Sequence, residues 1–151
     1  MNTTTSLLAL WKEARTRYSN QLTQLNEADL MKKIAPNSNS IGFLIRHIGD
    51  VELLFAKNVF GDSTVSVIAK TVIDQKDTGE WTDLNKLIAY TNMSFQRLET
   101  IILRQTEENW TETIVTKEFG TKTKAEAFGR IISHTTYHAG QIAIIKKYGI
   151  N

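Results

Sequence analysis

Hydrophobic residues recur at alternating steps of three and four in four stretches of the chain, which is the period of a helix with one apolar face. The pattern predicts helices over residues 5–26, 41–60, 82–105 and 123–148. Four long amphipathic helices in 151 residues are typical of an all-α, four-helix-bundle fold, which builds metal and ligand sites in its interior. The length fits a single domain over residues 1–151.

Polar residues at the predicted helix starts support these limits. Ser38 or Ser40 can cap the second helix, and Thr82 or Asp83 can cap the third. Thr123 opens a capping-box pattern at the start of the fourth. Each of these side chains offers an oxygen to the backbone N–H groups that the first turn of a helix leaves without partners.

Two long connections show no helical period. The first covers residues 61–81, and a connection of this length is typical of a functional loop or of a crossover between helices. Within it, residues 65–73 predict a short strand or an irregular turn. The second, residues 106–123, is rich in threonine and glutamate and predicts an extended loop or a small hairpin.

Three histidines carry the candidate chemistry. His134 and His138 are four residues apart in the fourth helix, so their side chains lie one turn apart, with about 6 Å between the Cβ atoms. Their helix face is apolar, as is the face of the second helix that carries His47, and a buried imidazole costs free energy unless its nitrogens find partners. Three core histidines bonded to hydroxyls or carbonyls are the plainer interpretation, but the spacing favours one shared metal ion.

Three neutral imidazoles and an open position form a standard catalytic site for zinc, and nickel, cobalt or iron would accept the same ligands. Such an ion lowers the pKa of a bound water or thiol towards neutrality. Thr135 stands where H-E-x-x-H zinc proteases have their general-base glutamate, which argues against that class. The absence of Glu-x-x-His argues against a ferritin-like di-iron site and leaves a mononuclear one.

Three further residues are candidates for catalytic roles. Tyr137 and Gln141 lie on the histidine side of the fourth helix and can line a pocket, although core packing of the ring and a hydrogen-bonded amide explain them equally well. Asp50 follows His47 by three residues and can reach the same pocket as a general base or as a partner of a metal ligand. A plain surface carboxylate is the simpler interpretation of Asp50.

Composition narrows the functional classes. Lysine and arginine number 18 against 16 aspartates and glutamates, and without a basic cluster we expect no nucleic-acid binding. The chain has no cysteine, which excludes disulfides, cysteine-ligated zinc and a protein thiol as nucleophile. No apolar run approaches the length of a membrane span or forms a signal sequence. We therefore expect a cytoplasmic protein without membrane contact.

Two segments resemble the DinB/YfiT-like superfamily. They are S-I-G-F-L-I-R-H-I-G-D-V-E over residues 40–52 and H-T-T-Y-H-A-G-Q over residues 134–141, the second of which is similar to the H-x-x-x-H-x-G-Q signature of that family. The resemblance implies a four-helix bundle with an up, down, down, up course and long crossover loops. It also implies a triad formed by His47, His134 and His138 that binds nickel, zinc or a similar divalent ion.

Known activities of this superfamily are metal-dependent transfer and isomerisation with bacillithiol, mycothiol or glutathione, and its members are often dimers. The resemblance therefore implies a low-molecular-weight thiol as cosubstrate, a small-molecule substrate and a homodimer here. Ala139 stands where the family frequently has an arginine, so a substrate contact through that arginine is not expected.

These features together predict a metal-dependent S-transferase, in which the ion binds a small thiol as thiolate and the thiolate attacks an electrophile in the pocket. The thiol must arrive as a cosubstrate because the chain has no cysteine. Three alternatives remain open. They are a metal-hydroxide hydrolase with Asp50 as base, a non-catalytic metal- or ligand-binding protein of the stress response, and a purely structural helical dimer.

Overall fold

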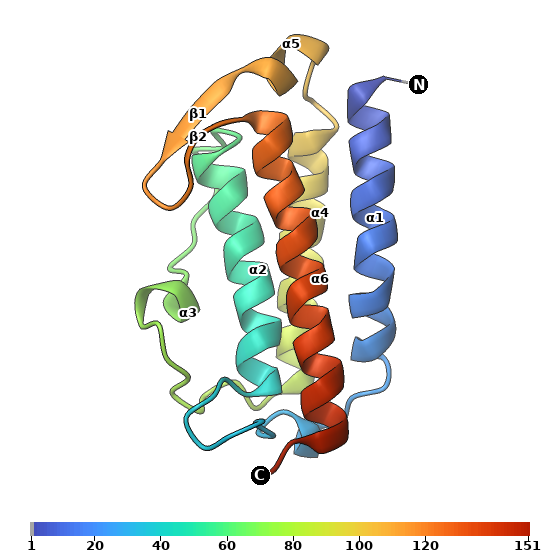
Figure 1. Ribbon diagram of the computed structural model, residues 1–151, viewed down its shortest axis with the longest axis vertical. Helices are drawn as coiled ribbons and strands as arrows, with labels where there is room; N and C mark the ends of the chain where they lie inside the picture. The colour runs from blue at the N-terminus through green and yellow to red at the C-terminus, as the bar shows by residue number, and fades with distance from the viewer. Residues whose placement is uncertain (1) are drawn as a thin grey trace.

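A computed structural model describes residues 2–151, in which four long helices lie side by side along the length of the molecule (Figure 1). They are α1 (Thr3–Leu22), α2 (Ile41–Asn58), α4 (Leu84–Ile102) and α6 (Lys124–Tyr148). Helix α1 contacts α4 and α6, and α2 contacts the same two helices. The expectation of a largely helical chain is confirmed.

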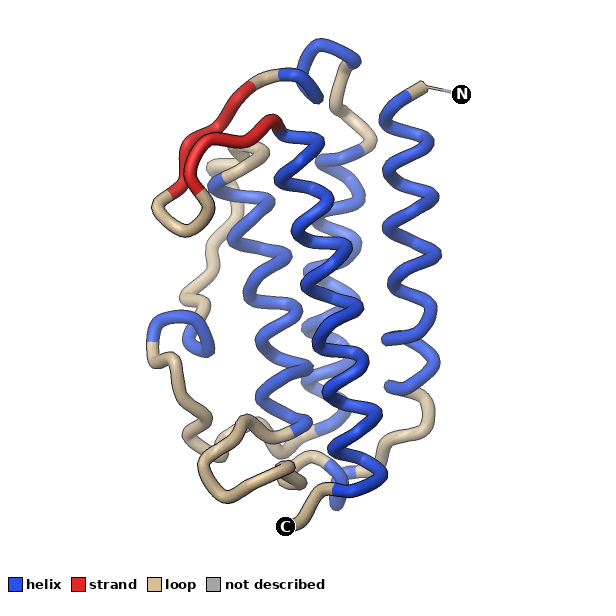
Figure 2. The backbone as a smooth tube through the Cα atoms, in the orientation of Figure 1, coloured by secondary structure: helices blue, strands red, loops and turns tan. Residues whose placement is uncertain are grey.

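Shorter elements occupy the connections (Figure 2). They are the 3-10 turn η1 (Glu27–Asp29), α3 (Lys70–Ile73), α5 (Glu107–Thr111), β1 (Thr113–Thr116) and β2 (Gly120–Thr123). The two strands pair antiparallel, with Thr113 opposite Thr123, and form the small hairpin expected within residues 106–123. Among the described residues, no helix is both long and apolar enough to cross a lipid bilayer.

Of the two structures predicted for residues 65–73, the strand is wrong: residues 65–69 are irregular, and residues 70–73 form the single helical turn α3. Ala69 precedes α3 in a left-handed backbone conformation, with φ of 49°. The carboxylate of Asp50 then accepts a hydrogen bond from the backbone N–H of Thr71. A contact with another helix therefore supports this turn, and no local period in the sequence could indicate it.

The choice between neighbouring cap residues is decided by side-chain contacts. Ser40 accepts a hydrogen bond from the backbone of Phe43 at the start of α2, and Asp83 accepts one from the backbone of Lys86 at the start of α4. Thr123 forms the expected capping box at the start of α6. The caps at Ser40 and Thr123 fix the starts of α2 and α6, the two helices that carry the histidines.

The predicted apolar faces form the core. Fully buried residues come from each of the four long helices, and they include Trp11, Ile48, Leu98, Ile131 and Ile142. Burial of such side chains supplies about 1.5–3 kcal/mol each. The core therefore holds α2 against α6 and sets the distance between their side chains.

The connection from α2 to α4 is long for a geometric reason. Figure 1 shows α2 and α4 running in the same direction, opposite to α1 and α6, and α2 packs against α4. A chain that leaves one end of α2 must return along the whole molecule before α4 can begin. This return path carries α3 and places it against α2.

Candidate metal centre

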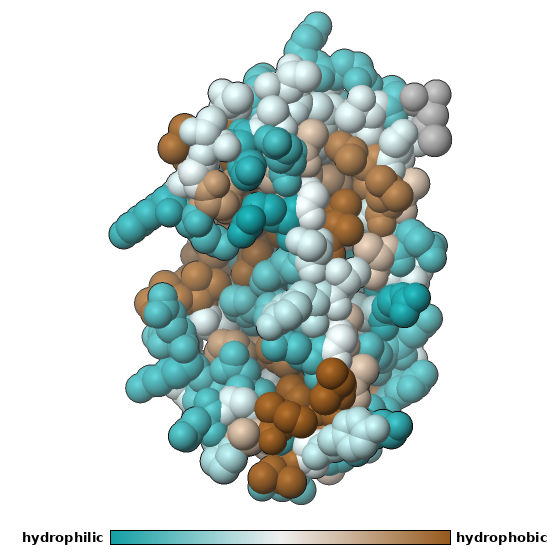
Figure 3. Space-filling model, viewed as in Figure 1, coloured by the Kyte–Doolittle hydropathy of each residue, from teal (hydrophilic) through white to brown (hydrophobic). Residues whose placement is uncertain are grey.

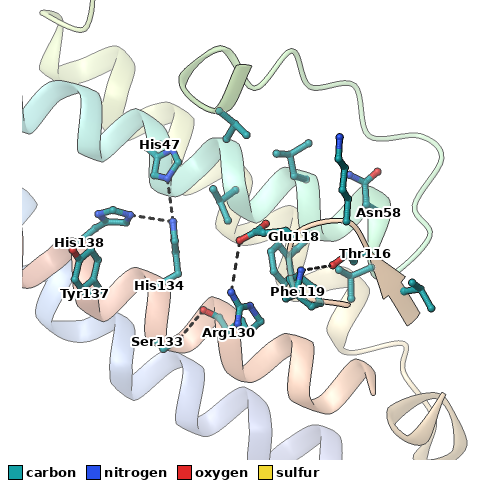
Figure 4. A pocket seen from close by; sticks show the side chains of 17 residues that line it. His47, Asn58, Thr116, Glu118, Phe119, Arg130, Ser133, His134, Tyr137 and His138 are labelled. Carbon is teal, nitrogen blue, oxygen red and sulfur yellow. Dashed lines mark hydrogen bonds and ion pairs between the residues drawn. The ribbon is translucent and has the colours of Figure 1, made fainter. Parts of the chain in front are cut away.

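Three histidine side chains from α2 and α6 point toward one another (Figure 4). The Nε2 atom of His134 lies 3.2 Å from Nε2 of His47 and 3.1 Å from Nε2 of His138. One ring nitrogen from each histidine lies within 4.8 Å of the other two. The structure therefore brings together the three residues that the sequence analysis chose, although His47 is 87 residues from His134.

The outer nitrogens of two rings have partners that fix where their protons lie. Thr71 donates its hydroxyl proton to Asp50, so its oxygen can only accept from His47 Nδ1, 3.1 Å away. His138 Nδ1 lies 2.6 Å from the amide oxygen of Gln141, which is also an acceptor. Both rings are therefore protonated on Nδ1, and each presents a bare Nε2 lone pair to the centre of the cluster.

Burial keeps the three imidazoles neutral. Loss of hydration lowers the pKa of His47 to about 4, and repulsion from His138 adds to this shift while Asp50 opposes it. Burial likewise lowers the pKa of His134 to about 3, with further repulsion from the other two histidines. The pKa of His138 is also lowered by burial. Neutral imidazole is the form that binds a metal ion.

The cluster fits a metal ion because its own protons cannot satisfy it. His134 Nε2 can donate at most one proton, to either His47 or His138, so one of the two short contacts would join two lone pairs. A divalent ion accepts all three lone pairs at once. Nitrogens about 2.0–2.1 Å from a common ion in tetrahedral geometry lie about 3.3 Å apart, close to the observed separations.

Asp50 is not the surface carboxylate that the simpler interpretation expected, because it is completely buried. Its Oδ1 accepts hydrogen bonds from Arg46 and from the hydroxyl of Tyr90, and its Oδ2 accepts two from Thr71. Since Thr71 in turn accepts from His47, the carboxylate acts on the cluster through an intervening hydroxyl. All lone pairs of this carboxylate are occupied.

Sequence reasoning missed Thr71, the residue that joins Asp50 to the cluster. It lies in the crossover connection, where no motif or period drew attention to it. The only available signal was the carboxylate of Asp50 three residues after His47, which needs donors if it is buried. Nothing in the chain order indicated that those donors would come from α3.

Tyr137 and Gln141 both lie beside His138. Gln141 accepts from the ring of His138 and donates to the hydroxyl of Tyr137, and the Tyr137 ring centre is 5.2 Å from that of His138. The Tyr137 side chain is exposed, so the alternative of core packing for this ring is wrong. It lines the cavity beside the cluster, whereas Gln141 orients a histidine from behind.

A cavity of about 860 Å³ opens on the three imidazoles. Its walls come from α2, α3, α6 and the β1–β2 hairpin, and apolar and polar side chains line it in similar numbers. The polar residues beyond the histidines include Asn58, Lys117, Glu118, Arg130 and Ser133. The volume is within the range of small-molecule sites, so a ligand of that size can reach the imidazoles.

Comparisons with known proteins identify the family through a family model and the fold through solved structures. The family model described as the DinB superfamily matches residues 10–142. No curated protein matches the chain.

A solved structure of a mycothiol-dependent maleylpyruvate isomerase superposes with a TM-score of 0.71 at 18% identity, over 92% of this chain. A histidine-to-alanine variant of such an isomerase gives 0.70 at 16% identity. The chain spans 60% of the length of either isomerase chain. A conserved protein from Enterococcus faecalis gives 0.71 at 17% identity, with 98% of this chain and 97% of that chain covered.

Proposed function

The chain belongs to the DinB superfamily, and on that premise we propose that it is a metal-dependent enzyme that joins a small thiol to an electrophile at a centre formed by His47, His134 and His138. The observation that carries the proposal is the convergence of three Nε2 atoms that have at most one proton among them. One proton cannot make both of the short contacts between these nitrogens into hydrogen bonds. The absence of cysteine from the chain and its similarity in fold to a mycothiol-dependent isomerase favour a thiol that arrives as cosubstrate.

A divalent ion held by these neutral ligands would supply undiminished positive charge, which lowers the pKa of a thiol or water in the open position. The residues of the chain have their own tasks. Thr71 and Gln141 hold the protons of His47 and His138 on Nδ1, so that both Nε2 atoms stay available. The apolar part of the cavity wall, which includes Val51 and Leu54, would limit the access of water to the reacting groups.

Zinc and nickel are the metals that we propose, since borderline divalent ions accept three imidazoles and small thiols together. We further propose that the four long helices form the up, down, down, up bundle of the family as one domain in the cytoplasm. The parallel course of α2 and α4 in Figure 1 supports this topology.

We also propose that the chain forms a homodimer. Figure 3 shows an apolar patch over the end of α6 near the C-terminus. The exposed side chains there include Ile34, Ile144 and Ile150. Contiguous exposed apolar side chains are typical of protein interfaces, and sedimentation analysis would test the assignment.

The decisive experiment measures metal content and thiol dependence in the same preparations. Protein purified without an affinity tag should contain about one divalent ion per chain, and the His134→Ala variant should contain almost none. Consumption of thiol in the presence of electrophiles should then require both the ion and the thiol. Equal turnover by the metal-loaded and metal-free proteins would refute the proposal.

The alternatives give different results in this experiment. A hydrolase would turn over without thiol, but Asp50 is unsuited to act as its base because the carboxylate is buried and all its lone pairs accept hydrogen bonds. A metal- or ligand-binding protein of the stress response would bind the ion and convert nothing. A purely structural dimer would bind no ion, and treatment with a metal chelator would leave its melting temperature unchanged.

A further inference from the structure

The cavity changes in character with distance from the histidines. Along α2, the lining residues that follow His47 are apolar from Val51 to Phe55, and the polar Asn58 comes only at the end of the helix. On the facing helix, Arg130 precedes His134 by one turn and also lines the cavity. The hairpin closes the far side with Thr116, Glu118 and Phe119, as Figure 4 shows, and Lys117 of the same hairpin also lines the cavity. A ligand that reached the imidazoles would therefore lie along an apolar wall and beside cationic groups.

Arg130 has donors to spare for a ligand. Its nearest acidic neighbour is Glu118, and the Nη2 to Oε1 distance of 3.7 Å is too long for a hydrogen bond. Both side chains are well exposed to water, where such a pair contributes little. The guanidinium group lies 4.8 Å from the ring centre of Phe119, a contact that orients it without using its N–H groups.

The balance of charge in the cavity favours an anion. Glu118 is the one acidic residue among those that line it, against Lys117 and Arg130. Three neutral imidazoles would leave the charge of a divalent ion uncompensated. A cleft with one sign of charge and low-dielectric walls concentrates ligands of the opposite sign.

We propose that the cavity binds a small organic acid, with its reactive end at the three imidazoles and its carboxylate held by Arg130. The assignment of the reactive end rests on the proposed function, whereas the carboxylate subsite rests on the cavity alone. Arginine can hold a carboxylate through two parallel hydrogen bonds. Because Arg130 precedes His134 by four residues, the subsite lies about 6 Å along α6 from the metal end, so a short apolar chain can join the two groups.

Four probes separate the two ends of this ligand: mercaptohexanoate, mercaptohexanol, hexanoate and hexanol. Their affinities are measured by calorimetry on the zinc-loaded and the metal-free protein. We expect each acid to bind about 10- to 100-fold more tightly than its alcohol in both forms, the range expected for hydrogen bonds to a charged group. The thiol should add affinity only in the zinc-loaded form, where it reports on the proposed function.

Arg130→Ala should abolish the preference for the acids and leave the zinc content unchanged. Arg17→Ala is the matched control, because it removes the same charge from the exposed face of α1, outside the cavity. Equal affinity for acids and alcohols in the original protein, or a preference that survives Arg130→Ala, would overturn the carboxylate subsite. A preference for acids with no gain from the thiol would uphold the subsite and count against the proposed thiol chemistry instead.

Discussion

Helix α2 carries two buried polar clusters that differ in how their charges are balanced. Toward α1 and α4, Glu52 forms an ion pair with Arg15 and accepts a hydrogen bond from Ser94, while Arg15 also donates to the carbonyl of Thr91. Toward α6, His47 meets two further imidazoles whose nitrogens lack enough protons to bond one another. The first cluster has its ionic partner within the protein, whereas the second has nitrogen lone pairs that a cation could accept.

This difference distinguishes a buried ion pair from a candidate metal site. Burial raises the pKa of Glu52, and the opposing effects of Arg15 and Ser94 offset only part of this shift, so the fold itself supplies a partial compensation for the buried charge. The histidine cluster has no acidic group among its ligands to compensate an ion. Its nitrogens instead face a cavity open to small molecules. Loss of a member should therefore affect folding in the first cluster and metal binding in the second.

The largest expected effect is on folding. Glu52→Ala leaves the Arg15 guanidinium buried without its carboxylate, which should lower the free energy of unfolding by about 3–5 kcal/mol. Urea unfolding of the metal-free protein measures this. The double variant Arg15→Met, Glu52→Leu should recover much of the loss, since it removes both charges. A single-variant loss below about 1 kcal/mol would show that water reaches the ion pair.

The second expected effect appears only when metal is present. Zinc at about 100 times its dissociation constant should raise the free energy of unfolding of the original protein by about 2.7 kcal/mol. His138→Ala should lose nearly all of this gain while its metal-free stability changes little. Thr136→Ala, on the same helix and outside the cavity lining, is the control and should keep the gain. An equal gain in His138→Ala would remove this residue from the metal site.

A smaller effect is expected from the hydroxyl that joins Asp50 to His47. Thr71→Val keeps the shape of the side chain but removes the acceptor for His47 Nδ1 and a donor to Asp50. Metal affinity should fall about 10- to 100-fold, as measured by competition with a chelator. Thr71→Ser retains the hydroxyl and should stay close to the original affinity. If valine and serine behave alike, the hydroxyl does not orient the ligand.

The smallest effect is expected at the exposed pair of Arg130 and Glu118. Glu118→Gln should change the free energy of unfolding by no more than about 0.5 kcal/mol, because both groups are solvated and their contact is long. Thermal unfolding against the Glu52→Ala variant gives the contrast between an exposed and a buried pair. A loss comparable to that of Glu52→Ala would mean that the hairpin depends on this contact.

The sequence by itself determined the features that depend on neighbours in the chain. The alternation of apolar residues located the four long helices, and the capping patterns located the starts at Ser40, Asp83 and Thr123 to within two residues. The four-residue spacing placed His134 and His138 on one face of α6. Helical period and capping are local because they follow from backbone hydrogen bonds a few residues apart.

Only the tertiary structure decided which distant groups meet. It brought His47 to the pair on α6, buried Asp50, and used one turn of a crossover connection to place Thr71 between them. It also placed a hairpin from residues 113–123 over the same cavity. These contacts arise from the packing of whole helices around a shared core. The sequence around any one residue does not show which distant polar side chains this packing will bring together.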